Sequence, residues 1–155
     1  MPMVFFDVMD TLVHNPFYHE IPAFFGISLQ ELLGVKHPTS WVEFERGEIS
    51  QAEYLRHMFA DERPYASEAF LAAVKEAYRW LDGMEPLLAD LRECGVEMHT
   101  LSNYPVWYRV IEEKLRLSRY LHWTFVSCLA GVRKPDRNRG RATNERSSRD
   151  DGLRR

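Results

Sequence analysis

The sequence predicts an α/β protein with a parallel sheet, in which a block of helices follows the first strand. Three observations support this class. The chain opens on a short apolar run, Met3 to Phe6, which is typical of a central strand buried on both faces. Helix-start signals then recur as far as residue 81, and beyond it helical and strand-like segments alternate. We therefore expect an α/β core over residues 1–14 and 82–135 and an all-helical insertion over residues 15–81.

Composition and charge are those of one globular domain. The 155 residues are 45% hydrophobic, and 20 Lys plus Arg against 23 Asp plus Glu give a formal net charge of -3. Without a basic excess or an apolar run of about 20 residues, the chain is expected to bind neither nucleic acid nor a membrane. Its two cysteines, Cys94 and Cys128, lack the paired spacing of a disulfide framework or a zinc site. A reducing compartment is therefore expected.

Several short helices are predicted in the insertion. Three Ser-x-x-Glu pairs have the spacing of a capping box, in which each side chain satisfies a backbone N–H of the other residue: Ser28–Glu31, Ser40–Glu43 and Ser50–Glu53. Gly34 and Gly47 stand where helix C-terminal caps are expected. Apolar residues at helical spacing over residues 70–81 predict the last helix of the insertion.

After residue 82 the pattern predicts two helix–strand pairs. Pro86 suits the first turn of a helix that Gly95 ends, and a strand is expected over residues 96–101. Pro105 suits the start of the next helix, which precedes a strand over residues 122–127. These strands extend the parallel sheet.

The last stretch, residues 136–155, differs from the rest of the chain. It holds seven arginines and four acidic residues, and Ala142 and Leu153 are its only apolar side chains. Because it has almost no apolar area to bury, we expect a disordered, solvated basic tail rather than a nucleic-acid-binding arm. Its charge of +3 leaves -6 for the rest of the chain.

Polar side chains follow each predicted strand, and together they suit phosphoryl chemistry. Asp7 and Thr11 come after the first strand, Ser102 and Asn103 after the second, and Lys134 after the third. The carboxyl ends of parallel strands share one edge of a sheet, which is where ligands bind. A carboxylate can attack phosphorus there, while a hydroxyl and an ammonium stabilise the equatorial charge.

Three motifs in this order resemble the haloacid dehalogenase-like hydrolase superfamily. They are the runs Phe6–Leu12, Leu101–Asn103 and Arg133–Asp136, which are similar to its first three signature motifs. The helical insertion resembles the cap that many members place over the active site. The resemblance implies a Rossmann-like core with an inserted helical cap.

Three segments resemble one particular branch of this superfamily. FFDVMDTLV, HPTSWVEFERGEIS and SNYPVWY are similar to a plant plastid branch of flavin mononucleotide hydrolases. This implies a magnesium-dependent phosphatase acting on a small phosphorylated molecule, with flavin mononucleotide (FMN) giving riboflavin and phosphate. It also implies a chloroplast location, although the chain has no visible transit peptide and is expected in the cytoplasm if expressed as given.

Roles for individual residues follow from the resemblance. Asp7 would be the nucleophile, which forms an aspartyl-phosphate, and also a magnesium ligand together with the backbone carbonyl of Met9. Ser102 and Lys134 would be catalytic residues that bind and neutralise the transferred group. Thr11 and Asn103 would bind substrate.

The chain departs from the superfamily pattern at Met9, where most phosphatases have an aspartate that moves the proton. A thioether cannot do so, which leaves Asp10 or water for the task at a cost of up to roughly 10² to 10⁴ in rate. The haloacid dehalogenases also lack an aspartate there and need no magnesium. Hydrolysis of a 2-haloacid is therefore an alternative function.

A second departure is the fourth motif, an acidic cluster after another helix and strand. Asp150 and Asp151 form the only adjacent acidic pair after Lys134, and no apolar strand precedes them. We interpret this pair as chance within a charged tail and predict a core that is incomplete after the third motif, as in a truncated chain. A catalytically silent isoform that acts as a binding module is thus a third alternative.

Aromatic side chains leave the substrate contacts open. Those of the insertion are more often core residues than flavin contacts, whereas those after the second motif are better placed for substrate. The first group is Phe17, Tyr18, Phe24, Phe25 and Trp41, and the second is Tyr104, Trp107 and Tyr108.

Overall fold

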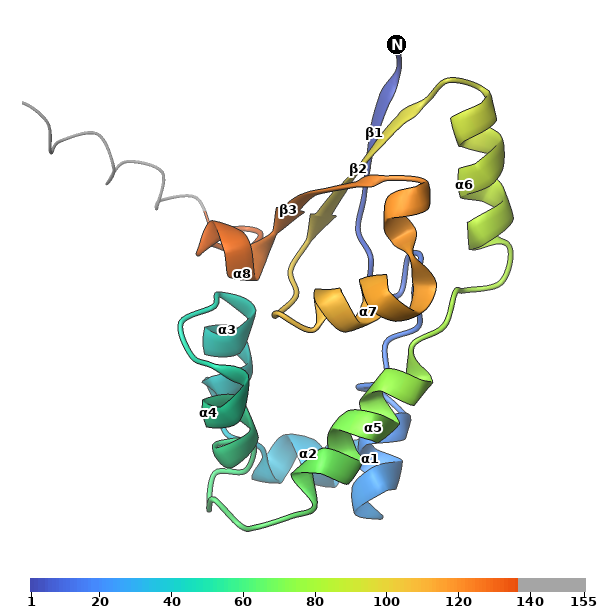
Figure 1. Ribbon diagram of the computed structural model, residues 1–155. Helices are drawn as coiled ribbons and strands as arrows, with labels where there is room; N and C mark the ends of the chain where they lie inside the picture. The colour runs from blue at the N-terminus through green and yellow to red at the C-terminus, as the bar shows by residue number, and fades with distance from the viewer. Residues whose placement is uncertain (137–155) are drawn as a thin grey trace, which may run out of the picture.

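The structure is a computed structural model that describes residues 1–136 (Figure 1). Most of the predicted tail, with the Asp150–Asp151 pair, lies outside the described residues. The elements are β1 (Met3–Phe6), α1 (Glu20–Phe25), α2 (Leu29–Val35), α3 (Ser40–Glu45), α4 (Gln51–Arg56), α5 (Ser67–Ala77), α6 (Met84–Glu93), β2 (Glu97–Ser102), α7 (Tyr108–Leu115), a 3₁₀ turn (Leu117–Arg119), β3 (His122–Val126) and α8 (Ser127–Ala130). No helix among residues 1–136 is both long and apolar enough to cross a membrane.

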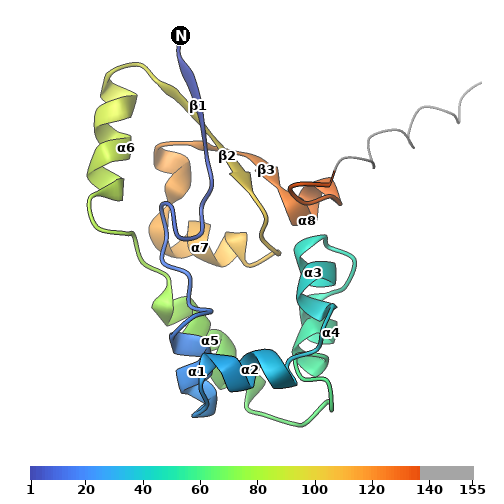
Figure 2. The same ribbon diagram turned by 180° about the vertical axis from the view of Figure 1, so that it is seen from behind.

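The predicted parallel α/β sheet is confirmed. Its three strands lie in the order β1-β2-β3, and both neighbouring pairs are parallel. Phe6 lies opposite Thr100, and Ser102 lies opposite Val126, so the strands end at one edge. Helices α1 to α5, which we call the helical unit, lie beyond this edge (Figures 1 and 2). The sheet therefore presents the ends of its strands to the helical unit.

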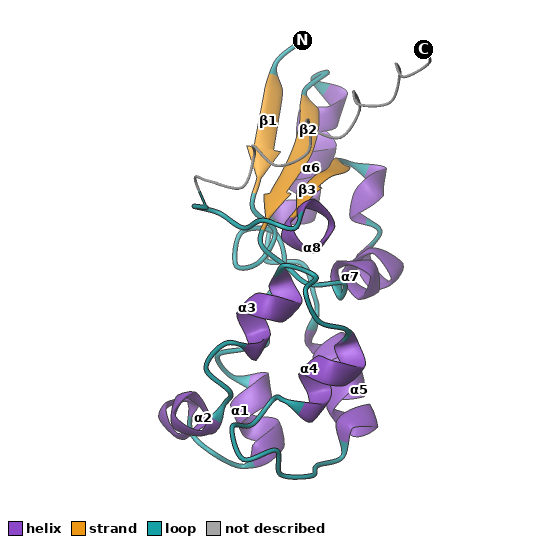
Figure 3. Ribbon diagram, turned by 90° about the vertical axis from the view of Figure 1, so that its left-hand side faces the viewer, coloured by secondary structure: helices purple, strands orange, loops and turns teal. Residues whose placement is uncertain are grey.

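The prediction that the first strand is buried on both faces is wrong. Met3 and Phe5 are 53% and 50% exposed, whereas Val4 and Phe6 are half-buried. On β2 the side chains of Met98 and Thr100 are buried. Figure 3 shows α6 and α7 on one side of the sheet. Because the described helices cover that side, alternate side chains of β1 face solvent on the other.

Two of the three predicted capping boxes form. At Ser28 and Ser50 both reciprocal hydrogen bonds are present, and these residues begin α2 and α4. The box predicted at Ser40 is wrong, because Ser40 is already inside α3 and its backbone N–H donates to His37 Nδ1 at 3.1 Å. Gly34 is also not a cap, since it lies within α2. Sequence spacing alone therefore does not fix the exact residue at which these helices begin and end.

One aromatic cluster joins the helical unit to the rest of the core. The rings of Phe44 on α3 and Tyr54 on α4 stack at 4.7 Å. Trp107, just before α7, packs edge-on against Phe44 at 5.3 Å and donates its indole N–H to Gln51 Oε1 at 2.6 Å. All three rings are buried. This shared packing fixes the helical unit against the chain that follows β2.

The approach of α3 to α8 depends on a glycine. Gly47 follows α3 with φ +70°, and a Cβ atom there would lie 2.5 Å from the carbonyl oxygen of Cys128. Gly26 has a similar φ of +65°, but nothing lies within 4 Å of its Cβ position. The two glycines share the left-handed backbone and differ in the space around it.

We predict that Gly47→Ala destabilises the chain more than Gly26→Ala. The left-handed backbone costs either alanine about 1–2 kcal/mol, and the contact with Cys128 adds roughly 1–3 kcal/mol at Gly47 only. Urea unfolding followed by circular dichroism measures both. Equal losses in the two variants would contradict the close approach of α3 to α8.

Candidate active site

An ion pair joins the end of β1 to the loop after α8. Asp7 is the first residue after β1, and its Oδ2 lies 3.1 Å from Nζ of Lys134. The other oxygen, Oδ1, accepts the backbone N–H of Val8 at 2.8 Å. Lys134 Nζ also donates to the carbonyl oxygen of Leu101 on β2 at 2.5 Å. The lysine therefore connects the ends of two strands.

Asn103, which directly follows β2, holds the backbone of Lys134. Its Nδ2 donates to the Lys134 carbonyl oxygen at 2.9 Å, and its Oδ1 accepts the Lys134 backbone N–H at 2.8 Å. Both backbone hydrogen-bonding groups of Lys134 are thus fixed by one side chain. In this structure Asn103 positions Lys134, in addition to lying on the wall of the cavity described below.

Ser102 and Thr11 differ in burial, since Ser102 is buried and Thr11 is exposed. Ser102 is fully buried, and its Oγ has no hydrogen-bond partner among the described residues. A buried hydroxyl without a partner is costly, so such groups merit a functional explanation. Thr11 is exposed on the turn after β1, and no hydrogen bond of the described part links its side chain to Asp7 or Lys134. The structure therefore gathers Asp7, Asn103 and Lys134 but does not bring Thr11 to them.

Asp10 stabilises the turn that follows Asp7. Asp10 has φ 54°, and its Oδ1 accepts the backbone N–H of Asn15 at 3.2 Å. Aspartate tolerates this left-handed conformation through such local bonds. Met9 instead lines the cavity. The position where most superfamily phosphatases have an aspartate therefore presents a thioether to the cavity.

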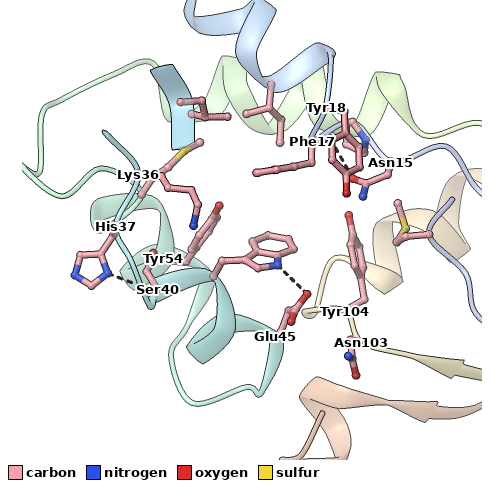
Figure 4. Close-up of a pocket in the computed structure, with 16 residues that line it drawn as sticks. Asn15, Phe17, Tyr18, Lys36, His37, Ser40, Glu45, Tyr54, Asn103 and Tyr104 are labelled. Carbon is pink, nitrogen blue, oxygen red and sulfur yellow. Dashed lines mark hydrogen bonds between the residues drawn. The ribbon is translucent and has the colours of Figure 1, made fainter. Parts of the chain in front are cut away.

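A cavity of about 290 Å³ lies between the helical unit and the strand ends (Figure 4). This is near the lower end of the roughly 300–1,000 Å³ typical of small-molecule sites. The aromatic side chains of its wall are Phe17, Tyr18, Trp41, Tyr54 and Tyr104. The polar ones include Asn15, Lys36, His37, Ser40, Glu45 and Asn103. Such a wall suits a flat ligand that also carries polar groups.

Glu45 is a buried carboxyl of this cavity that the sequence reasoning missed. It is 6% exposed, and its Oε1 accepts the indole N–H of Trp41 at 2.7 Å. Arg133 Nη2 lies 3.0 Å from Oε2, yet Oε2 receives no aligned hydrogen bond from the described residues. Burial raises the pKa of the Glu45 carboxyl, and the positive charge of Arg133 offsets only part of this. The i, i+4 spacing of Trp41 and Glu45 on α3 is the one local signal of this pair.

Two further contacts tie α3 to the chain around Lys134. Arg46 Nη2 lies 3.0 Å from Asp136 Oδ2, and the Ser127 hydroxyl donates to the Glu45 carbonyl oxygen at 2.6 Å. The backbone N–H of Arg133 and the guanidinium of Arg46 hold the pKa of Asp136 below its usual range. Residues on both sides of Lys134 are therefore held by the helical unit.

The residues present fit part of a magnesium shell. Magnesium usually takes one or two protein carboxylates, with phosphate oxygens and waters completing its octahedron. Asp7 offers one carboxylate, and the Met9 carbonyl oxygen accepts no hydrogen bond within residues 1–136. In the same part of the chain, no group of three or more His, Cys, Asp or Glu side chains could hold a metal ion. The described residues would thus supply only a small part of the ligands of such a site.

Solved structures identify the fold. A HAD family enzyme from Bacteroides thetaiotaomicron, solved as an aspartate-to-alanine variant with magnesium and inorganic phosphate, matches with a TM-score of 0.65. The match is 19% identical and covers 88% of this chain and 73% of that enzyme. A second structure of that enzyme gives a TM-score of 0.64 at 16% identity, over 87% and 72% of the two chains. The chain thus has the Rossmann-like α/β fold of HAD enzymes.

A sequence relative makes the similarity more specific. The chain is 49% identical over 136 residues to the chloroplast flavin mononucleotide hydrolase 1 of Arabidopsis thaliana. The alignment covers 88% of this chain and 56% of the relative, so the chain spans little more than half the relative's length. No family model matches the chain. The resemblance to haloacid dehalogenase-like hydrolases and their flavin mononucleotide branch is confirmed.

The raised pKa of Glu45 predicts a pH dependence of stability. Above pH 4.5, the ordinary value of a glutamate, the folded chain keeps a proton that the unfolded chain has lost. The folded state then binds more protons than the unfolded state, so stability falls as pH rises from 4.5 to the raised pKa.

Urea unfolding of the wild type and of Glu45→Gln across this pH range tests the prediction. The free energy of unfolding of the wild type, relative to that of Glu45→Gln, should decrease as pH rises. Glu43→Gln, a change at a half-buried residue of the same helix, serves as the control. A relative stability that increases with pH would contradict the assigned direction.

Proposed function

We propose that the chain is the catalytic part of a phosphoric monoester hydrolase. The observation that carries the proposal is the Asp7–Lys134 pair at the end of β1, next to Asn103 in the wall of an aromatic cavity. The solved HAD enzyme with this fold and the flavin mononucleotide hydrolase relative support it. The same relative favours a phosphatase over the haloacid dehalogenase alternative.

The proposed reaction has two steps. A carboxylate oxygen of Asp7 forms a bond to phosphorus while the bond from phosphorus to the ester oxygen breaks, and the leaving alcohol takes a proton. Water then attacks phosphorus, the bond to Asp7 breaks, and phosphate and the free carboxylate result. The ammonium of Lys134 stabilises negative charge on the transferring group in both steps. In this scheme, the Ser102 hydroxyl, which has no hydrogen-bond partner within residues 1–136, donates to a phosphoryl oxygen.

Magnesium is part of this proposal. Asp7 and the Met9 carbonyl would hold the ion, which when bound would supply positive charge to the phosphoryl oxygens. The thioether of Met9 cannot supply a proton, and one oxygen of Asp10 accepts the Asn15 backbone N–H. In this proposal the leaving alcohol therefore takes its proton from water, with Asp10 as the alternative donor.

FMN is the substrate we propose, on the strength of the relative's name and the aromatic wall of the cavity. The product would be riboflavin. In the same proposal the helical unit acts as a cap that selects the substrate and excludes water. A chloroplast location is likewise proposed from the relative's name alone.

Replacing the nucleophile tests the reaction. We expect magnesium-dependent phosphate release from FMN by the wild type and a loss of about a thousandfold or more in Asp7→Asn, because an amide cannot form the aspartyl-phosphate. The control is Asp61→Asn, a change at an exposed aspartate paired with Arg63. Turnover that persists in Asp7→Asn would sink the mechanism. Halide release from a 2-haloacid in the presence of chelator would favour the dehalogenase instead, and a folded chain without either activity would favour the binding module.

Alanine variants of Ser102 and Ser127 test whether the role of each serine is catalytic or structural. Ser102 Oγ has no hydrogen-bond partner to lose in the described part of the chain, whereas Ser127 Oγ donates to the Glu45 carbonyl oxygen and accepts the Tyr104 backbone N–H at 2.9 Å. Ser102→Ala should change the free energy of unfolding by no more than about 0.5 kcal/mol and lower phosphate release at least tenfold. Ser127→Ala should lose about 1–3 kcal/mol of stability. Urea unfolding and phosphate release check both variants, and a Ser102→Ala loss as large as that of Ser127→Ala would assign Ser102 a structural role.

A further inference from the structure

We propose that Glu45 binds a hydroxyl group of the leaving alcohol, and that Lys36 binds the far edge of its ring. The two residues would then fix the direction in which the substrate lies in the cavity. This inference rests on the proposed function, and it assigns to the cavity a substrate whose ring and phosphate are joined by a hydroxylated chain.

The carboxylate of Glu45 is a hydrogen-bond acceptor in the wall of the cavity. Its side chain is buried and lines the cavity, and its Oε1 accepts the indole N–H of Trp41. Its Oε2 is itself buried and lies 3.0 Å from Nη2 of Arg133. Each carboxylate oxygen has more than one lone pair, so the carboxylate can accept a further hydrogen bond from a ligand. A hydroxyl is a neutral donor that suits this position.

The cavity is lined from two directions. Met9 and Asn103 line it from the strand ends, and Asn103 holds the lysine that pairs with Asp7. Lys36 and His37 line it from the link between α2 and α3. Figure 4 shows Glu45 beside Asn103 and Tyr104, and it shows the Lys36 side chain directed into the cavity near Tyr54. Glu45 therefore faces the part of a ligand next to the phosphate, and Lys36 faces the part farthest from it.

The groups along the cavity suit different parts of one ligand. Lys36 is half-buried and has no ion-pair partner among the described residues, so its ammonium is available to ring carbonyl or nitrogen acceptors. The rings of Trp41, Tyr54 and Tyr104 also line the cavity, and they suit a flat aromatic system. FMN has this order of groups, namely a phosphate, a hydroxylated chain and a ring with carbonyl oxygens.

Two flavins that lack a phosphate distinguish the proposed Glu45 contact from the proposed Lys36 contact. Riboflavin carries the hydroxylated chain, and lumiflavin has the same ring with a methyl group in its place. Binding is followed by quenching of flavin fluorescence, which does not require turnover. The quantity of interest is the ratio of the two Kd values in the wild type and in each variant.

We expect Glu45→Met to weaken riboflavin binding by about tenfold or more and to leave lumiflavin binding within about twofold, because only riboflavin loses a hydrogen bond to a charged acceptor. Glu45→Gln, which keeps the shape and one acceptor, should give a smaller loss in the same direction and replaces the Met variant if that variant does not fold. Lys36→Met should weaken both flavins by the same factor. The controls are Glu43→Gln and Lys75→Met, the second at a surface lysine paired with Glu113.

Three results would overturn the inference. They are an equal loss for both flavins in the Glu45 variants, no loss for either, and no binding of either flavin by the wild type. The proposed function is judged separately by phosphate release. If riboflavin binding depends on Glu45 and FMN is not hydrolysed, the inference stands and the phosphatase proposal fails. If FMN is hydrolysed and the Kd ratio is unchanged in the Glu45 variants, the reverse holds.

Discussion

The contact between Asp7 and Lys134 is the constraint on which the site depends, because it joins residues 127 positions apart in the chain. Both side chains are partly exposed, so the pair contributes little to stability by itself. Its importance is positional. The Lys134 ammonium also binds the carbonyl of Leu101, and Asn103 holds the Lys134 backbone on both sides. The ends of β1 and β2 and the loop after α8 are therefore fixed as one unit.

The same loop also connects the sheet to the helical unit. Arg133 pairs with Glu45 and Asp136 with Arg46, so the residues flanking the Lys134–Pro135 pair bind α3 while Lys134 binds Asp7. The Ser127 hydroxyl adds a link from α8 to the backbone of α3. A movement of α3 away from the sheet would have to break these contacts or displace the loop that carries Lys134. The position of α3 beside the cavity and the position of the ammonium therefore both depend on contacts of one short segment.

The sequence predicts the sheet edge well because its geometry is set by the backbone. Parallel strands end together, so Asp7, Asn103 and Lys134 could be grouped from their positions after three apolar runs. Thr11 fits the same rule, yet its exposed side chain forms no hydrogen bond to Asp7 or Lys134 among residues 1–136. Burial of β1 was mispredicted for another reason. An apolar run indicates which side chains a strand can bury. Whether a face of the strand is buried depends on the helices that pack against it.

Glu45 marks the limit of such reasoning. Its burial and its contact with Arg133 arise from packing between segments nearly ninety residues apart, and no local pattern records this. Trp41 on α3 and Lys36 just after α2 also reach the cavity through the tertiary packing of the helical unit. Groups proposed to act on the phosphate thus come from strand ends, and groups proposed to select the alcohol come from the helical unit. This division explains why motifs point to a class of reaction more readily than to a substrate, since specificity lies in side chains that only the tertiary structure brings together.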